Sequence, residues 1–268
     1  MTQAGRRQEG GREAALGLPA RRLGPAWAAL IVLALLGWLI TIRQATTMGI
    51  GPGAMGLTLP AFLLLWIVMM AAMMFPSVAP VAILWSRSIA ARATGPARTW
   101  RISTFVGGYL VIWGSFGVLA YVALLATEHL VESAPDAAHW LGVTIFVVAG
   151  IYQLTPLKSA CLRHCRSPVM SLLHYANFKG RLRDFRVGLH HGAYCVGCCW
   201  GLMVVLVAVG VMNVAAMVLL AVVIFLEKLW SRGELLSRIV GVALIAIAVV
   251  AAFDPSILPA LRPGAGGM

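Results

Sequence analysis

The sequence predicts an all-α, polytopic transmembrane helical bundle of about seven helices, and three observations support this prediction. Hydrophobic residues make up 60% of the chain and charged residues only 11%, with a mean hydropathy of +0.89. Soluble domains have roughly 45–50% apolar and about 25% charged residues. Seven apolar stretches follow one another, and basic residues gather in alternate connections between them. The net charge of +12 therefore indicates membrane lipid as the partner of this chain, and not nucleic acid.

The seven apolar stretches define the expected spans. They lie at 26–42, 58–84, 102–126, 139–156, 189–211, 214–229 and 239–253. About 20 residues cross a bilayer as a helix, and shorter helices span when their flanking side chains reach the interface. The first stretch lacks a small-residue cleavage site, so we expect an anchor helix there and not a removed signal peptide.

The same pattern divides the chain into three parts. Residues 1–25 are expected to form a disordered, basic cytoplasmic arm, and residues 256–268 a flexible tail. Residues 26–255 are expected to form one transmembrane bundle. Within this bundle, residues 157–188 are expected to form a cytoplasmic loop that carries the sequence CLRHC.

Basic residues predict the orientation of the bundle. Five precede residue 26, four lie between the second and third stretches, seven between the fourth and fifth, and three follow the sixth. The other connections hold only Arg43 and Arg262. Lys and Arg are enriched in cytoplasmic loops. We therefore expect a cytoplasmic N-terminus and an external C-terminus.

Five cysteines form two groups that flank the expected cytoplasmic loop. CLRHC occupies 161–165, and HHGAYCVGCCWGLM occupies 190–203. Thiols and imidazoles are costly in a membrane segment and are often functional there. On a helix, His191, Cys195 and Cys198 share one face. Because both groups flank one loop, they can meet at its base, although buried cysteines also serve as small hydrophobic residues or redox groups.

Methionines supply a third group of soft donors. The segment WIVMMAAMMFPSVAP at 66–80 carries them at helical spacing, followed by Pro76 and Pro80, which predict a kink. The methionines are expected at a depth in the membrane similar to that of Cys198 and Cys199. Filling of the core competes with metal binding as their role, since methionine suits irregular gaps.

Three segments resemble a known family. WIVMMAAMMFPS, YQLTPLKSACLRHCRSP and GLHHGAYCVGCCWGLMVVLVAVGVMN are similar to signature blocks of bacterial predicted metal-binding integral membrane proteins, over about 60–230. The resemblance implies a multi-pass protein of the bacterial inner (cell) membrane that handles a metal. Its candidate ligands map to the five cysteines of this sequence.

The donor types indicate which metal to expect. Thiolate and thioether ligands select Cu(I), zinc or iron–sulfur clusters, and the presence of methionine favours copper as Cu(I). Zinc stays open as an alternative, because two cysteines of CLRHC with His164 and one histidine of 190–191 would make a tetrahedral site. The candidate ligands are Cys161, His164, Cys165, His190, His191, Cys195, Cys198, Cys199, Met70, Met73, Met74 and Met203.

Metal delivery without catalysis is the expected function. The chain has no P-loop motif for a nucleotide, and no catalytic residue is assigned. A copper-dependent enzyme or a metallochaperone is the expected protein partner. A metal permease, a quinone-linked thiol redox protein and a structural subunit are the alternatives. Glu227 and Lys228 are expected to form an interfacial pair at the end of the sixth stretch.

Overall fold

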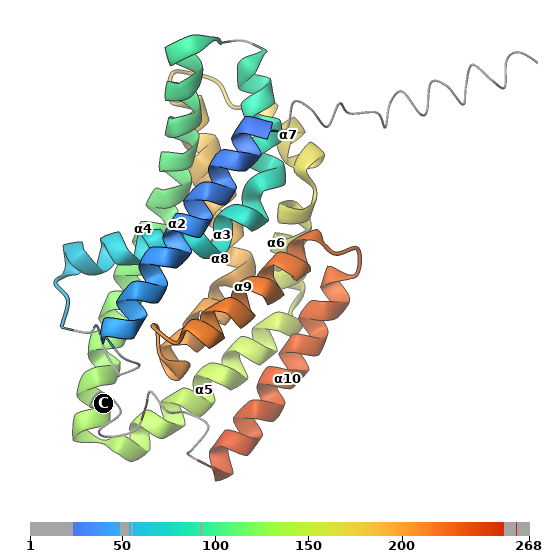
Figure 1. The fold of residues 1–268 in the computed structure, drawn as a ribbon. Helices are drawn as coiled ribbons and strands as arrows, with labels where there is room; N and C mark the ends of the chain where they lie inside the picture. Colours follow the sequence, from blue (N-terminus) through green and yellow to red (C-terminus); the bar gives the residue numbers. More distant parts are fainter. Residues whose placement is uncertain (1–23, 49–53, 55, 92, 255–260, 262–268) are drawn as a thin grey trace, which may run out of the picture.

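A computed structural model describes residues 24–48, 54, 56–91, 93–254 and 261. The elements in these ranges are helices, which confirms the predicted all-α bundle (Figure 1). They are α2 (Gly24–Met48), α3 (Leu59–Ala90), α4 (Gly95–Ser133), α5 (Pro135–Leu154), α6 (Pro156–Arg166), α7 (Pro168–Ala176), α8 (Arg183–Val209), α9 (Val214–Leu229) and α10 (Gly233–Phe253). Most of the predicted N-terminal arm and C-terminal tail lies outside the described residues.

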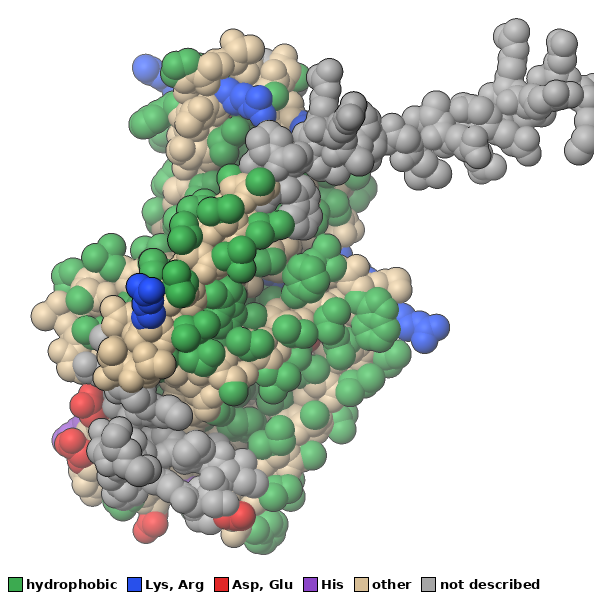
Figure 2. All heavy atoms as spheres, viewed as in Figure 1, with side chains coloured by type: hydrophobic (Ala, Val, Ile, Leu, Met, Phe, Trp, Pro, Cys, Tyr) green, Lys and Arg blue, Asp and Glu red, His purple; other side chains and the backbone are tan. Residues whose placement is uncertain are grey.

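Six helices in the described ranges are long and apolar enough to cross a membrane, namely α2, α3, α4, α5, α8 and α10. The sixth predicted span corresponds to α9, which has 16 residues and is shorter than the others. Large apolar side chains such as Leu119 and Phe253 are exposed. On the face drawn in Figure 2 hydrophobic side chains cover much of the surface, and Asp and Glu side chains gather at its lower end. Extended apolar surfaces of this kind are typical of contact with a membrane.

The helix α3 carries the predicted prolines in its interior. It is continuous from Leu59 to Ala90, with Pro76 and Pro80 inside it. In Figure 1 its first and last parts run in different directions, as two internal prolines predict. The side chain of Ser77 donates to the carbonyl oxygen of Met74 at 2.9 Å. The four methionines before the prolines are all buried in the main core: Met69, Met70, Met73 and Met74.

Glycines let two helix pairs approach until their backbones touch. A Cβ atom on Gly188 of α8 would collide with the carbonyl oxygen of Phe105 of α4, so only glycine fits there. Between α5 and α10, a Cβ on Gly150 would lie 2.8 Å from the carbonyl oxygen of Gly241, and a Cβ on Gly241 would lie 2.9 Å from that of Gly150. Small residues at helix contacts are common in membrane bundles.

The segment expected as a cytoplasmic loop contains two short helices, α6 and α7. Each begins with a proline in its first turn, where the missing N–H is not needed. The Thr155 hydroxyl accepts from the backbone N–H of Lys158 and caps α6. At the other end of α6, the Arg166 guanidinium donates to the carbonyl oxygens of Glu227, Trp230 and Ser231. This side chain therefore binds α6 to the turn between α9 and α10.

Candidate metal centre

The three cysteines of α8 lie in the interior of the bundle. Cys195, Cys198 and Cys199 are almost fully buried. The thiols of Cys198 and Cys199 donate to the carbonyl oxygen of Cys195, at 3.1 and 2.9 Å. Such bonds to the preceding turn hold the thiols near one another along α8.

The helix α6 brings the CLRHC cysteines against this part of α8. Cys165 is buried in the same core as the three cysteines of α8. Cys161 is half-buried, and its sulfur packs against Gly197, where a Cβ atom would lie only 3.1 Å from it. The structure thus joins the two cysteine groups that are separated by about 30 residues in the sequence.

Burial and neighbouring thiols raise the pKa of both cysteine thiols of α6. Burial is the largest influence on Cys161 and raises the pKa of its thiol. The pKa of Cys165 is also raised, first by its hydrogen bond with Cys198 and then by burial. The protonated form of both thiols is therefore favoured.

Imidazoles from three helices gather beside the thiols. The Tyr175 hydroxyl bridges His164 Nε2 at 3.1 Å and His191 Nδ1 at 3.2 Å. His191 is buried, whereas His164 is half-buried and its ring stacks on Tyr194 at a centroid distance of 3.9 Å. Desolvation, followed by the charges of His190 and His174, lowers the pKa of His164 to about 4. This imidazole is therefore neutral near pH 7, as metal ligation requires.

The exposed His174 of α7 joins this imidazole group and was missed by the sequence prediction. Its ring stacks on that of half-buried His190 at a centroid distance of 4.8 Å, and it lies 6.2 Å from that of His164. The spacing of these residues in the sequence gives no sign of the contact, because α6 and α7 were not predicted as helices.

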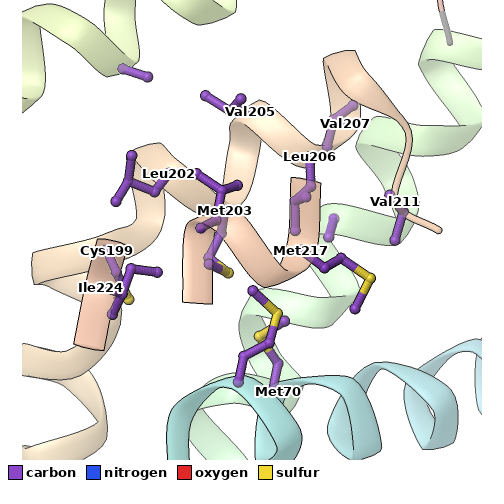
Figure 3. Packing of buried hydrophobic residues seen from close by; sticks show 14 of the residues in the cluster. Met70, Cys199, Leu202, Met203, Val205, Leu206, Val207, Val211, Met217 and Ile224 are labelled. Carbon is purple, nitrogen blue, oxygen red and sulfur yellow. The ribbon is translucent and has the colours of Figure 1, made fainter. Parts of the chain in front are cut away.

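The predicted thioether ligands belong to the same core as the thiols. Met70, Met73, Met74 and Met203 are buried together with Cys195, Cys198 and Cys199. Met203 lies one turn after Cys199 on α8. In Figure 3 the side chains of Met70, Met203 and Met217, from α3, α8 and α9, extend into the same interior. Within the described ranges, no three His, Cys, Asp or Glu side chains are placed to hold a metal ion as they stand.

A buried ion pair lies next to the cysteines of α8. Lys158 Nζ is 2.7 Å from Glu227 Oε2, and each side chain is only 1% exposed. Gln153 donates to the other oxygen of Glu227 at 2.9 Å, and Lys158 also donates to the carbonyl oxygen of Cys198. The expectation that Glu227 pairs with Lys228 at the membrane interface is therefore wrong, because the partner of Glu227 comes from α6.

Lys228 instead faces the thiols. Its Nζ atom lies 3.1 Å from Cys195 Sγ and 3.2 Å from Ser77 Oγ, and the hydroxyl of Tyr109 lies 3.1 Å from the same sulfur. Lys158 and Lys228 were counted among the basic loop residues that predict the orientation of the bundle, but both are buried. The sequence does indicate a functional role for these two lysines, since charged residues beside a membrane segment often mark a functional site.

Comparison with known proteins identifies the family. No curated protein and no solved structure matches the chain significantly. A family model described as "PpoB2: Copper chaperone" matches residues 63–251. This range runs from the first turns of α3 into the last turn of α10 and contains the cysteines, histidines and methionines named above. The match agrees with a metal-handling role, and the chain belongs to the PpoB2 copper chaperone family.

Proposed function

We propose that this protein is a membrane-embedded copper chaperone that binds Cu(I) through its buried thiols and delivers it to a copper-dependent partner. The burial of Cys165 of α6 in the same core as Cys195, Cys198 and Cys199 of α8 is the observation that carries the proposal. It gives two soft ligands from different helices in one buried place, with further thiols adjacent.

The chemistry of the donors favours Cu(I) over zinc. The cluster supplies thiols and, at its inner side, the thioether of Met203. Soft sulfur ligands select Cu(I), whereas thioethers are not among the usual ligands of zinc. In the proposed binding step, the thiols lose their protons and turn from the Cys195 carbonyl oxygen toward the metal. The site is thus completed by side-chain rotation when copper arrives.

Cys161 is the proposed point of transfer to the partner. It is half-buried, while the other four cysteines are buried. An accessible thiol beside buried ones lets a partner replace the ligands one at a time. The expected orientation would place α6 at the cytoplasmic face of a bacterial inner membrane, so the partner would approach from the cytoplasm.

A metal permease is the second candidate, and the buried methionines favour it. In Figure 3 Met70 and Met217 lie farther from Cys199 than Met203 does, so soft donors continue through the interior from the cysteines. A chaperone needs one site at which copper is bound and released. A permease needs at least a second site farther along the path.

Cu(I) affinity of single and double variants tests these alternatives. Purified protein in detergent is titrated with Cu(I) against a competing chelator, for the wild type, Cys165→Ser, Cys198→Ser and the double variant. We expect each single change to remove most of the binding and the double change to remove little more, because ligands of one site are not additive.

The other possible outcomes would contradict the proposal or would favour the permease over the chaperone. Additive losses would mean two separate sites and would favour the permease. Full binding by both single variants would rule out these thiols as ligands. Cys161→Ser serves as the comparison: we expect it to retain more Cu(I) than Cys165→Ser but to release it more slowly to the chelator.

A further inference from the structure

Lys228 is buried beside the thiol cluster without a carboxylate partner among the described residues. Lys158 and Glu227 neutralise each other at 2.7 Å. Lys228 is 7% exposed, and none of the salt bridges among the described residues includes it. Its polar contacts are Cys195 Sγ and Ser77 Oγ, which are neutral groups when the cysteine is protonated. This buried ammonium group therefore has no carboxylate as its counter-anion among the described residues.

The groups that can provide this anion are the thiols. Cys195 Sγ lies 3.1 Å from the Lys228 ammonium, and the thiols of Cys198 and Cys199 contact the carbonyl oxygen of the same Cys195. The other neighbours of the Cys195 sulfur and the ammonium are the hydroxyls of Tyr109 on α4 and Ser77 on α3. A buried charge without a counter-charge is unfavourable in a medium of low dielectric constant. Negative charge formed on the thiols is correspondingly favoured.

Metal binding forms this negative charge, and its amount depends on the metal. Two thiols that bind Cu(I) release two protons, and the resulting bis-thiolate complex carries one net negative charge. With the Lys228 ammonium the total is zero. The same two thiolates with a divalent ion form a neutral complex, which leaves the ammonium without a counter-charge. A divalent ion would need a third thiolate to reach the same balance.

We propose that Lys228 is a specificity-determining residue whose ammonium group makes the thiol cluster select a monovalent cation bound by two thiolates. This inference rests on the proposed function and adds the physical basis of metal choice. Sulfur ligands alone do not provide it, because they also bind soft divalent ions. The neighbouring Lys158 cannot take this role, since Glu227 already neutralises it.

The test compares pairs of cations that differ in charge and share an electron configuration. Cu(I) and Zn(II) form one pair, and Ag(I) and Cd(II) form the other. The affinities of all four ions are measured by chelator competition for the wild type, Lys228→Gln and Lys228→Arg. Glutamine removes the charge without adding a sulfur ligand, and arginine keeps the charge. Circular dichroism and size-exclusion chromatography confirm folding, and Lys228→Leu replaces Lys228→Gln if the latter does not fold.

We expect the neutral variant to lose at least about tenfold in the preference for the monovalent ion in both pairs, since a charge a few ångströms away in a low-dielectric site contributes at least this much. Lys228→Arg is expected to keep the wild-type preference. Wild-type protein that binds Cu(I) tightly, with an unchanged preference in the neutral variant, would overturn this inference alone. Wild-type protein that binds neither Cu(I) nor Ag(I) would overturn the proposed function, and this inference with it.

Discussion

The contact between α5 and α10 differs from the one between α6 and α8 in what holds it together. The first joins two long apolar helices through Gly150 and Gly241, whose backbones approach to van der Waals distance. The second joins a short polar helix to α8 through thiols and through the buried Lys158, which donates to the carbonyl oxygen of Cys198 and pairs with Glu227 of α9. The buried charges and thiols of the second contact have no counterpart in the first, which agrees with the metal-handling role of the family.

The contact of α6 with α8 and α9, called the polar region below, is disrupted most strongly by removing one partner of its buried ion pair. Glu227→Gln leaves Lys158 charged and only 1% exposed. We expect a loss of about 3–5 kcal/mol in unfolding free energy, because an unpaired buried charge is strongly destabilising. Thermal unfolding in detergent, followed by circular dichroism, measures it.

Two further variants serve as controls for this prediction. Glu234→Gln removes a carboxylate whose contact with Arg163 is long, at 3.9 Å, and exposed, so it should change stability little. Replacing both Lys158 and Glu227 by methionine should restore most of the lost stability. Equal effects of the two glutamine variants would mean that the buried pair is not formed.

The apolar contact between α5 and α10 is tested by adding a methyl group where the two helix backbones touch. Gly241→Ala places a Cβ 2.9 Å from the carbonyl oxygen of Gly150, so α5 and α10 must separate. We expect a loss of about 1–3 kcal/mol in unfolding free energy, as for other overpacked cores, with the Cu(I) affinity of the folded protein unchanged.

The matched control is Gly107→Ala on α4. A Cβ there has no neighbour within 4 Å, and alanine has a higher helix propensity. This variant should be as stable as the wild type or slightly more stable. A large loss of Cu(I) affinity in folded Gly241→Ala would show that the two regions are not independent.

The smallest expected effect concerns the thioether at the inner side of the cluster. Met203→Leu preserves volume and apolarity, so folding should be nearly unchanged. If the sulfur ligates copper, Cu(I) affinity falls by about tenfold or less, a change of up to about 1.4 kcal/mol. Met170→Leu, at a position that is 65% exposed on α7, is the control. Equal Cu(I) affinities of the two variants would assign Met203 to packing alone.

The sequence predicts the long helices well and the polar region only in part. Hydropathy alone identifies the spans, because apolar residues dominate each window. The helices α6 and α7 were missed although Pro156 and Pro168 mark their first turns. Their short length and many polar residues resemble those of a loop. The meeting of the cysteine groups follows from the chain returning to one end of the bundle, whereas the contacts between their thiols do not.

The roles of the lysines illustrate what a sequence pattern cannot provide. Counting charges treats each lysine as a solvated loop residue, yet Lys158 and Lys228 point inward. Which carboxylate or thiol each one meets depends on the relative rotation of α6, α8 and α9. That rotation is determined by contacts between residues far apart in sequence, such as those of Arg166 with the end of α9.

The bonds of Arg166 have a mechanical consequence. This side chain follows Cys165 directly and grips the carbonyl oxygens of Glu227 and Trp230, on either side of the last residues of α9. These hydrogen bonds couple the end of α6 to the end of α9, so a displacement of one helix end is resisted by the other. The position of Cys165 on α6 is thereby tied to that of Lys228 on α9.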